Sequence, residues 1–188
     1  MDQREKALAQ LRRHAAKKLD AHEAAMVADT IRFVETHEDC LLRTCAPGHL
    51  TGSAWIVDAT RTRTLLTHHR KLDKWLQLGG HADGEADLLA VAWREAEEES
   101  GLKRLREMSA ELFDVDRHLI PARGSEPEHF HYDLRFIIEA DPAEALTVTS
   151  ESKDLAWVAV ADVTRLNPEE SMARMVRKTL GVPMTPGR

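Results

Sequence analysis

The highest density of acidic side chains lies in residues 83–99, which hold seven Asp and Glu residues and a single basic residue, Arg94. On a helix, Glu95, Glu98 and Glu99 stand at positions i, i+3 and i+4, so they share one face with about 5 to 6 Å between neighbouring Cβ atoms. Like charges at this spacing destabilise a helix unless a cation lies among them. Mg²⁺ and Mn²⁺ prefer carboxylate, carbonyl and water oxygens, so the pattern suits either ion.

A solvated acidic helix face would show the same spacing, and the spacing alone favours neither interpretation. The pair Gly79-Gly80, which precedes this acidic segment, favours the metal site. Glycine permits tight backbone conformations and close approach of other groups, so the carbonyl of Gly80 can point toward the same cation.

Residues 80–102 resemble the signature of the Nudix hydrolase family, which reads Gly, five residues, Glu, seven residues, then Arg-Glu-apolar-x-Glu-Glu-x-Gly-apolar. The stretch from Arg94 to Leu102 matches the second half at every position. In the first half, Glu85 follows Gly80 after four residues rather than five, and an alanine occupies the place of the family's first Glu. We interpret this departure as a local register shift in which Glu85 supplies the missing carboxylate.

The resemblance implies a role for each matched residue. Glu98 and Glu99 would be metal ligands, and Glu95 would be a ligand or the general base. Arg94 would hold Glu95 through a charge-assisted hydrogen bond, and the Gly80 carbonyl would complete the metal site. The implied reaction is the attack of a metal-activated water on a phosphorus of a diphosphate linkage, with Mg²⁺ or Mn²⁺ as the cofactor.

Two further candidates lie outside the signature and carry charge. Glu151 precedes a predicted strand, at a position where members of the family often place another acidic residue, so it is a candidate metal ligand or catalytic base. An ordinary surface Glu is the competing interpretation. Arg70 belongs to a basic run over residues 68–74 that would orient substrate phosphates, unless the run is only surface charge.

Histidines supply the remaining candidates for substrate binding. His81 follows Gly80 directly and therefore lies close to the expected metal site. His131 and His129 alternate along a predicted strand, which places both side chains on the same side of it. They would contact the substrate or bind a soft metal, although a pair of histidines alone is weak support for a zinc site.

The first part of the chain is rich in helix-forming residues. Over positions 2–37, apolar side chains recur at helical spacing on either side of Asp20. We predict two amphipathic helices broken near Asp20, within an N-terminal helical extension over residues 1–45. This extension lies outside the family resemblance and is a candidate dimerisation or lid element.

The rest of the chain, residues 46–188, is expected to form one catalytic domain. Strands are predicted over residues 51–58, 63–69, 111–120, 131–140 and 154–160, and helices over 87–100, ended by Gly101, and 168–180. Strands before and after a central helix indicate an α+β domain with a mixed sheet. The resemblance implies, more specifically, a Nudix-like α/β/α sandwich.

Composition limits the class of protein. The 188 residues are 43% hydrophobic and 31% charged, as in folded soluble domains, and a formal net charge of −6 argues against non-specific coating of nucleic acid. No apolar run approaches the roughly 20 residues of a membrane helix, and the N-terminus lacks a secretory pattern. We therefore expect a cytoplasmic protein with no stable nucleic-acid or membrane partner, and homodimer formation is left open. The family resemblance implies a small nucleotide-type substrate.

The sequence therefore predicts a metal-dependent pyrophosphohydrolase that cleaves the diphosphate linkage of a nucleoside diphosphate derivative or of a nucleoside triphosphate. The alternative is a non-catalytic Nudix-like module that binds a nucleotide and signals its presence to a partner. The intact set of Arg94, Glu95, Glu98 and Glu99 favours the enzyme, because a pure binding protein needs no water-activating carboxylates.

Overall fold

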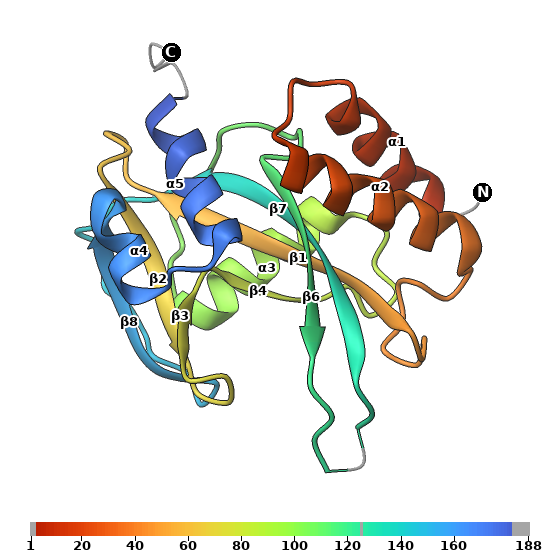
Figure 1. Ribbon diagram of the computed structural model, residues 1–188. Coiled ribbons are helices and arrows are strands. Elements are labelled where there is room, and N and C mark those ends of the chain that lie inside the picture. The colour runs from red at the N-terminus through yellow and green to blue at the C-terminus, as the bar shows by residue number, and fades with distance from the viewer. Residues whose placement is uncertain (1–2, 125, 182–188) are drawn as a thin grey trace.

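The computed structural model describes residues 3–124 and 126–181, and it begins with two helices, α1 (Arg4–Ala15) and α2 (Ala21–Thr36). The carboxylate of Asp20 accepts a hydrogen bond of 2.8 Å from the backbone N–H of Glu23 and so caps the start of α2. The predicted pair of helices, with a break near Asp20, is confirmed (Figure 1).

The strands of the described residues form one mixed sheet around β1. They are β1 (Gly48–Val57), β2 (Arg63–His69), β3 (Lys74–Leu76), β4 (Leu78–His81), β5 (Arg106–Glu107), β6 (Asp114–Ile120), β7 (His129–Glu139) and β8 (Ser152–Ala159). Strand β1 runs parallel to β7 along its whole length and antiparallel to its partners on the other edge. The predicted α+β class with a mixed sheet is therefore confirmed.

Strand β1 has two successive partners on one edge. Residues 51–54 pair with β4, whereas Ile56 and Val57 pair with β2. Strand β2 continues the sheet through β8 and β3, so β2 and β4 diverge from the same strand. This divergence places the glycine pair of β4 beside the N-terminal half of β1.

Helix α3 (Leu88–Ser100) packs on one face of the sheet and confirms the predicted central helix. Its first backbone N–H groups are capped by the carboxylate of Asp87, and Gly101 ends it in the left-handed conformation at φ 77°. A Cβ built on Gly52 of β1 would lie 2.5 Å from the carbonyl oxygen of Leu88, so only glycine lets the helix approach this closely.

Helix α5 (Glu170–Gly181) covers the opposite face and completes the predicted sandwich (Figure 1). It follows a short 3₁₀ turn, η1 (Val160–Asp162), and the short helix α4 (Val163–Leu166). Met172 and Met175 of α5 pack with Trp55 of β1 and Ile137 of β7 in a separate hydrophobic cluster. Neither these two short helical pieces nor the two-residue strand β5 was predicted from the sequence.

The two N-terminal helices share the hydrophobic core of the sheet rather than standing apart from it. Leu11 of α1 and Val34 of α2 are fully buried in the same cluster as Leu134 of β7. The ring of Phe33 stacks on that of Tyr132, with 3.9 Å between centroids and an interplanar angle of 7°. Burial of these side chains ties the extension to the domain that follows it.

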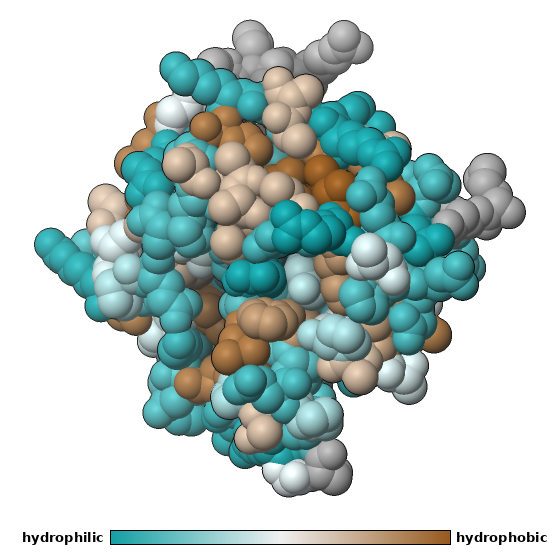
Figure 2. Space-filling model, turned by 45° about the vertical axis from the view of Figure 1, so that its right-hand side comes forward, coloured by the Kyte–Doolittle hydropathy of each residue, from teal (hydrophilic) through white to brown (hydrophobic). Residues whose placement is uncertain are grey.

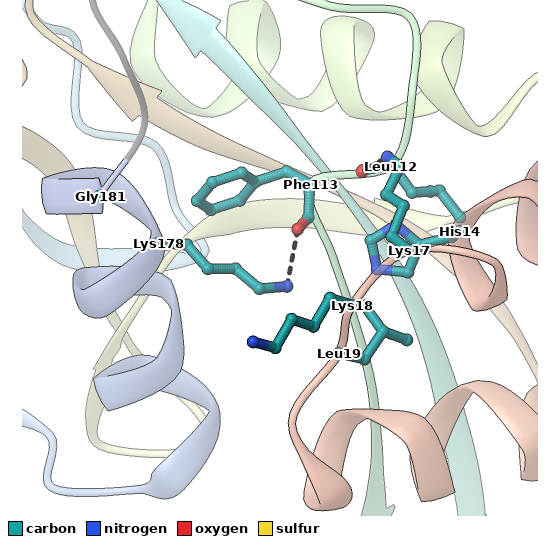
Figure 3. A pocket seen from close by; sticks show the side chains of 8 residues that line it. All are labelled: His14, Lys17, Lys18, Leu19, Leu112, Phe113, Lys178 and Gly181. Carbon is teal, nitrogen blue, oxygen red and sulfur yellow. Dashed lines mark hydrogen bonds between the residues drawn. The ribbon is translucent and has the colours of Figure 1, made fainter.

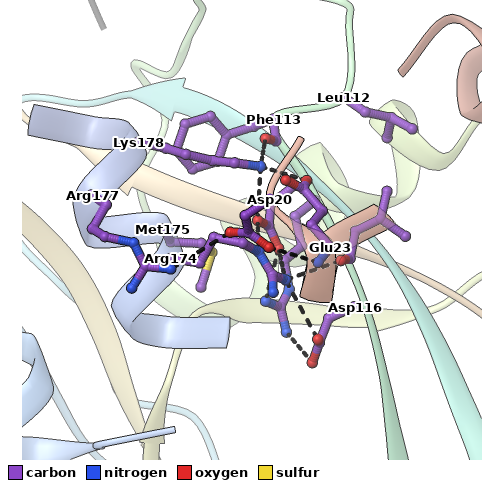
Figure 4. A network of polar contacts seen from close by, with 12 residues as sticks. Asp20, Glu23, Leu112, Phe113, Asp116, Arg174, Met175, Arg177 and Lys178 are labelled. Carbon is purple, nitrogen blue, oxygen red and sulfur yellow. Dashed lines mark hydrogen bonds and ion pairs between the residues drawn. The ribbon is translucent and has the colours of Figure 1, made fainter. Parts of the chain in front are cut away.

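A buried ionic network adds polar contacts between the extension and the C-terminal helix (Figure 4). Arg174 of α5 donates to Asp114 of β6 at 2.7 and 2.8 Å, and Lys178 donates to the same carboxylate and to Glu23 of α2. Burial alone would raise the pKa of Asp114, but the hydrogen bond from Arg174 and the charges of Arg135 and Lys178 lower it below its usual value. The network therefore holds α2, α5 and β6 together.

The surface shown in Figure 2 is largely hydrophilic, with small hydrophobic patches between polar residues. The most exposed large hydrophobic side chains come from separate parts of the chain, among them Leu42, Val148 and Leu180. None of the described helices is long and apolar enough to cross a membrane.

Candidate functional site

The carboxylate of Glu95 reaches from α3 onto the glycine pair of β4. A Cβ built on Gly80 would lie 2.6 Å from each carboxylate oxygen of Glu95, so any other residue there would displace the carboxylate. The next carboxylate on this face, Glu99, accepts a hydrogen bond of 2.9 Å from the backbone N–H of Gly79. Gly80 therefore makes room for the acidic face of α3 against β4, whereas a Cβ on Gly79 would meet Ser53 of β1 instead.

Arg94 fixes the position of Glu95. Its Nη2 donates to Oε1 of Glu95 at 2.8 Å and to the backbone carbonyl of His81 at 3.2 Å, so one guanidinium links the carboxylate to β4. The hydrogen bond to Glu95 raises the pKa of Arg94. This is the charge-assisted hydrogen bond that the signature predicts.

Glu99 is a carboxyl group whose charge is poorly stabilised by the protein. Its side chain is nearly buried, and only 7% of the residue is exposed. Burial raises its pKa to about 8. The hydrogen bond from the Gly79 N–H opposes this shift, and the negative charges of Glu95 and Glu151 add smaller contributions in the same direction as burial. Glu98, one turn away from Glu95 on α3, is exposed.

Glu151 comes to the same region from a different element, the turn before β8. Arg70 holds this turn at the end of β2, donating from Nε to the carbonyl of Ser150 at 2.9 Å and from Nη2 to that of Ser152 at 2.8 Å. The backbone N–H of Arg70 also donates to the carbonyl of Glu151 at 2.9 Å. Two predicted site residues thus meet here, and the guanidinium of Arg70 has structural partners.

Glu85 lies away from the other carboxylates of the signature. It is exposed, and its Oε1 accepts a hydrogen bond of 2.8 Å from the backbone N–H of Asp87, at the N-terminal end of α3. Glu95, Glu98 and Glu99 belong to the C-terminal half of the same helix. The structure therefore gives Glu85 a place at the helix start.

The ring of His81 points to the other side of β4, because neighbouring residues of a strand face opposite ways. There it joins four other histidines in a group that we call the histidine cluster: His49 of β1, His81 of β4, His118 of β6, and His129 and His131 of β7. The ring centroid of His131 lies 4.7 Å from that of His49 and 4.9 Å from that of His81.

Three members of the cluster, His49, His81 and His131, are neutral at pH 7. Burial lowers the pKa of His49 and of His81 to about 4 and that of His131 to about 2, and neighbouring cluster rings act in the same direction. Sequence reasoning found the pair His129 and His131 but missed His49, since only the parallel pairing of β1 with β7 places it opposite His131.

A buried carboxylate follows the histidine cluster along the same face of the sheet. Asp133 accepts hydrogen bonds from Thr51 and Ser53 at 2.8 and 2.7 Å on one oxygen, and from Gln77 and Arg135 at 3.0 and 2.7 Å on the other. Both oxygens therefore have partners, and the group serves as a structural anion. No sequence motif pointed to it.

A basic pocket between the N-terminal helices and α5 lies apart from the acidic face of α3 (Figure 3). Its lysines include Lys17, which donates to the carbonyl of Leu112, and Lys178, which donates to the carbonyl of Phe113. Because these ammonium groups already have partners within the chain, the pocket belongs to the contact between the extension and the domain.

The chain is similar to a known family model and to solved structures. A model of the NUDIX domain matches residues 49–179. Among solved structures, the E. coli dihydroneopterin triphosphate pyrophosphohydrolase is 15% identical, with 69% of this chain and 92% of that chain covered and a TM-score of 0.56. A Nudix hydrolase from M. smegmatis, RenU, is 18% identical, with 74% and 90% covered and a TM-score of 0.53. These two likenesses concern the fold. No curated protein matches the chain.

Proposed function

Since the chain belongs to the Nudix family, we propose that it uses Mg²⁺ or Mn²⁺ to cleave the diphosphate linkage of a nucleoside diphosphate derivative or of a nucleoside triphosphate. The family assignment makes it a Nudix-type hydrolase that acts on phosphorus–oxygen anhydride bonds. The observation that carries the proposal is the packing of the α3 carboxylates against Gly79 and Gly80.

The residues at this position fit a hard divalent cation. Glu95, Glu98 and Glu99 offer carboxylate oxygens, and Gly80 offers a carbonyl, which are the ligand types that Mg²⁺ and Mn²⁺ prefer. The raised pKa of Glu99 supports the same assignment, because it marks a carboxylate whose charge needs a positive partner. We therefore assign these four residues to the metal.

The cation and the protein have different roles in the proposed reaction. When bound, the cation lowers the pKa of an attacking water and stabilises charge on the phosphate oxygens. Arg94 holds Glu95 against β4, which keeps this carboxylate in one orientation. Glu95 and Glu151 are the two candidates to accept the proton of the water, since both lie close enough to raise the pKa of Glu99.

The residues that the sequence predicted for substrate contacts lie on two sides of β4. Arg70 remains a candidate for orienting phosphates, because it lies beside Glu151. His81 and His131 remain candidates for contacts with a part of the substrate other than its phosphates, because their rings lie on the face of β4 opposite Glu95. One structural neighbour is named for dihydroneopterin triphosphate, which is compatible with a substrate that carries a chain of phosphates.

A panel of substrates tests the proposal. Nucleoside triphosphates, sugar nucleotides and dinucleotides are incubated with the full chain and Mg²⁺ or Mn²⁺, and the released phosphate-ended fragments are separated by chromatography. We expect metal-dependent cleavage of one class between two phosphorus atoms. Metal-dependent binding without cleavage across the panel would instead support the non-catalytic module that senses nucleotides.

A further inference from the structure

The histidine cluster contains three ring nitrogens that converge on one point. Register explains how: the parallel pairing of β1 with β7 sets His49 opposite His131, and His129 lies two residues earlier on the same side of β7. One ligand atom from each of these three residues lies within 4.8 Å of the other two. Residues from two strands thus bring three possible ligand atoms into one small group.

Hydrogen bonding orients one of these rings for metal binding. Nδ1 of His129 lies 2.9 Å from the carbonyl oxygen of Pro127, which can only accept, so Nδ1 carries the proton. The Nε2 atom of a neutral ring then has a free lone pair. A carbonyl that receives the other ring N–H is the usual support for a metal-binding histidine.

The distance between two of the ring nitrogens agrees with a tetrahedral site. Nε2 of His129 lies 3.2 Å from Nε2 of His131. Two nitrogens bound to one Zn²⁺ at about 2.0 to 2.1 Å in tetrahedral geometry are separated by about 3.3 Å. The separation of these two nitrogens therefore needs almost no change for them to share an ion.

His49 supplies an independent observation. It is buried, and neither of its ring nitrogens has a hydrogen-bond partner among the described residues. A buried polar atom without a partner costs free energy, and a metal bond would remove that cost for one nitrogen. The nearby positive charge of Arg43 does not oppose a cation strongly, because its guanidinium forms a bidentate pair with Asp83 at 2.6 and 2.5 Å.

We propose that His49, His129 and His131 bind a Zn²⁺ ion at a second metal site, separate from the α3 carboxylates. Three imidazoles are a donor set for zinc rather than for Mg²⁺, which prefers oxygen ligands. The fourth position is open to water or to His81, whose ring centroid lies 4.9 Å from those of His49 and His131. Strand β4 separates this site from Glu95, which lies on its other face.

Zinc binding by the full chain, measured without any substrate, tests this proposal. The purified protein is stripped with a chelator and dialysed against Zn²⁺ with Mg²⁺ in excess, and the bound zinc is counted by elemental analysis. Affinity is measured by competition with a chromophoric chelator. Replacement of zinc by Co²⁺ gives a visible spectrum that reports nitrogen ligands in tetrahedral geometry.

Four variants separate the histidine cluster from other zinc-binding groups. His131→Gln and His129→Gln remove proposed ligands, and circular dichroism establishes that each variant is folded. His37→Gln is the matched control, because its ring stacks on Phe33 at the end of α2. Glu98→Gln tests whether the ion belongs to the α3 carboxylates.

The expected result is one tightly bound Zn²⁺ in the wild type, in His37→Gln and in Glu98→Gln. Mutation of residues that only support metal ligands typically lowers metal affinity roughly 10- to 100-fold. The two cluster variants, which lack a ligand, should lose more zinc affinity than that. The proposal is overturned if the wild type retains no zinc, if both folded cluster variants bind it as tightly as the wild type, or if only Glu98→Gln loses it.

Discussion

The carboxylate of Glu95 lies directly over Gly80, so close that a Cβ on this glycine would be 2.6 Å from each carboxylate oxygen. Gly80 lies in β4 and has no positive φ, so its requirement for glycine comes from this close approach. The contact between Gly80 of β4 and Glu95 of α3 therefore explains why the motif combines a glycine with a glutamate that lies 15 residues later in the sequence.

Replacing Gly80 with alanine should damage the reaction more than the fold. The new methyl group meets the end of a flexible side chain, so Glu95 can move away at little cost in stability. A displacement of about 1 Å at a reacting centre can cost about 100-fold in rate, and we expect a loss of kcat on that order. Gly181→Ala, where a Cβ meets nothing within 4 Å, is the control. Equal kcat values for the two variants would contradict this account.

The raised pKa of Glu99 predicts how the stability of the metal-free protein depends on pH. Burial raises the pKa of Glu99 in the folded state to about 8 from its usual value of 4.5, so between these values the folded protein binds more protons than the unfolded chain. Its contribution to stability is therefore complete below about pH 4.5 and is lost as pH rises toward 8.

Glu99→Gln should remove this dependence while keeping the acceptor for the Gly79 N–H. We expect the unfolding free energy of the variant, relative to that of the wild type, to increase by more than about 1 kcal/mol from pH 5 to pH 8. Urea unfolding of both proteins in the presence of a chelator measures this difference. The histidines titrate in both proteins, so their effect cancels when the two are compared. A constant difference between the two proteins at both pH values would refute the assignment.

Arg70 has two candidate roles, orienting substrate phosphates and holding the turn that carries Glu151, and its hydrogen bonds favour the second. Its guanidinium donates to the carbonyls on either side of Glu151, so Arg70→Gln should lower kcat by about 10-fold or more through loss of position. If Glu151 takes part in the reaction, the effects of Arg70→Gln and Glu151→Gln will be non-additive in the double variant. A higher KM at unchanged kcat in Arg70→Gln would mean that it binds phosphate instead.

Phe33 tests whether the N-terminal helices are part of the folded core. It is 4% exposed and stacks on Tyr132, so Phe33→Ala should cost about 3 kcal/mol of unfolding free energy. Leu180→Ala, at a side chain that is 66% exposed on α5, should stay within about 0.5 kcal/mol of the wild type. Similar denaturant midpoints for both variants would show that the extension contributes little to stability.

Local sequence signals predicted most of the elements of this fold. Strand β2 has the predicted limits, residues 63–69, and the predicted helix over 87–100 matches α3 because Asp87 and Gly101 are effective caps. The two-residue strand β5 was missed because so short a segment has no periodicity. The divergence of β2 and β4 from β1 could not be predicted, since it depends on pairing between distant segments.

The candidate site also has features that the sequence could predict and features that it could not. The carboxylates of α3 could be predicted because helical spacing fixes which side chains share a face. The orientation of His81 away from Glu95 depends on strand pairing, and the convergence of His49 with His131 depends on parallel pairing across the sheet. Glu85 shows a further limit, because its bond to the Asp87 N–H depends on the local path of the loop.

The most direct test of the central claim is metal-dependent turnover by Glu98→Gln, with Glu97→Gln as the control on the same helix. The substrate is the best one of the panel, and Mg²⁺ is titrated for each protein. We predict that Glu98→Gln melts like the wild type and loses turnover at every Mg²⁺ concentration, whereas Glu97→Gln keeps it. Wild-type turnover in a folded Glu98→Gln variant would contradict the assignment of the α3 carboxylates to the metal.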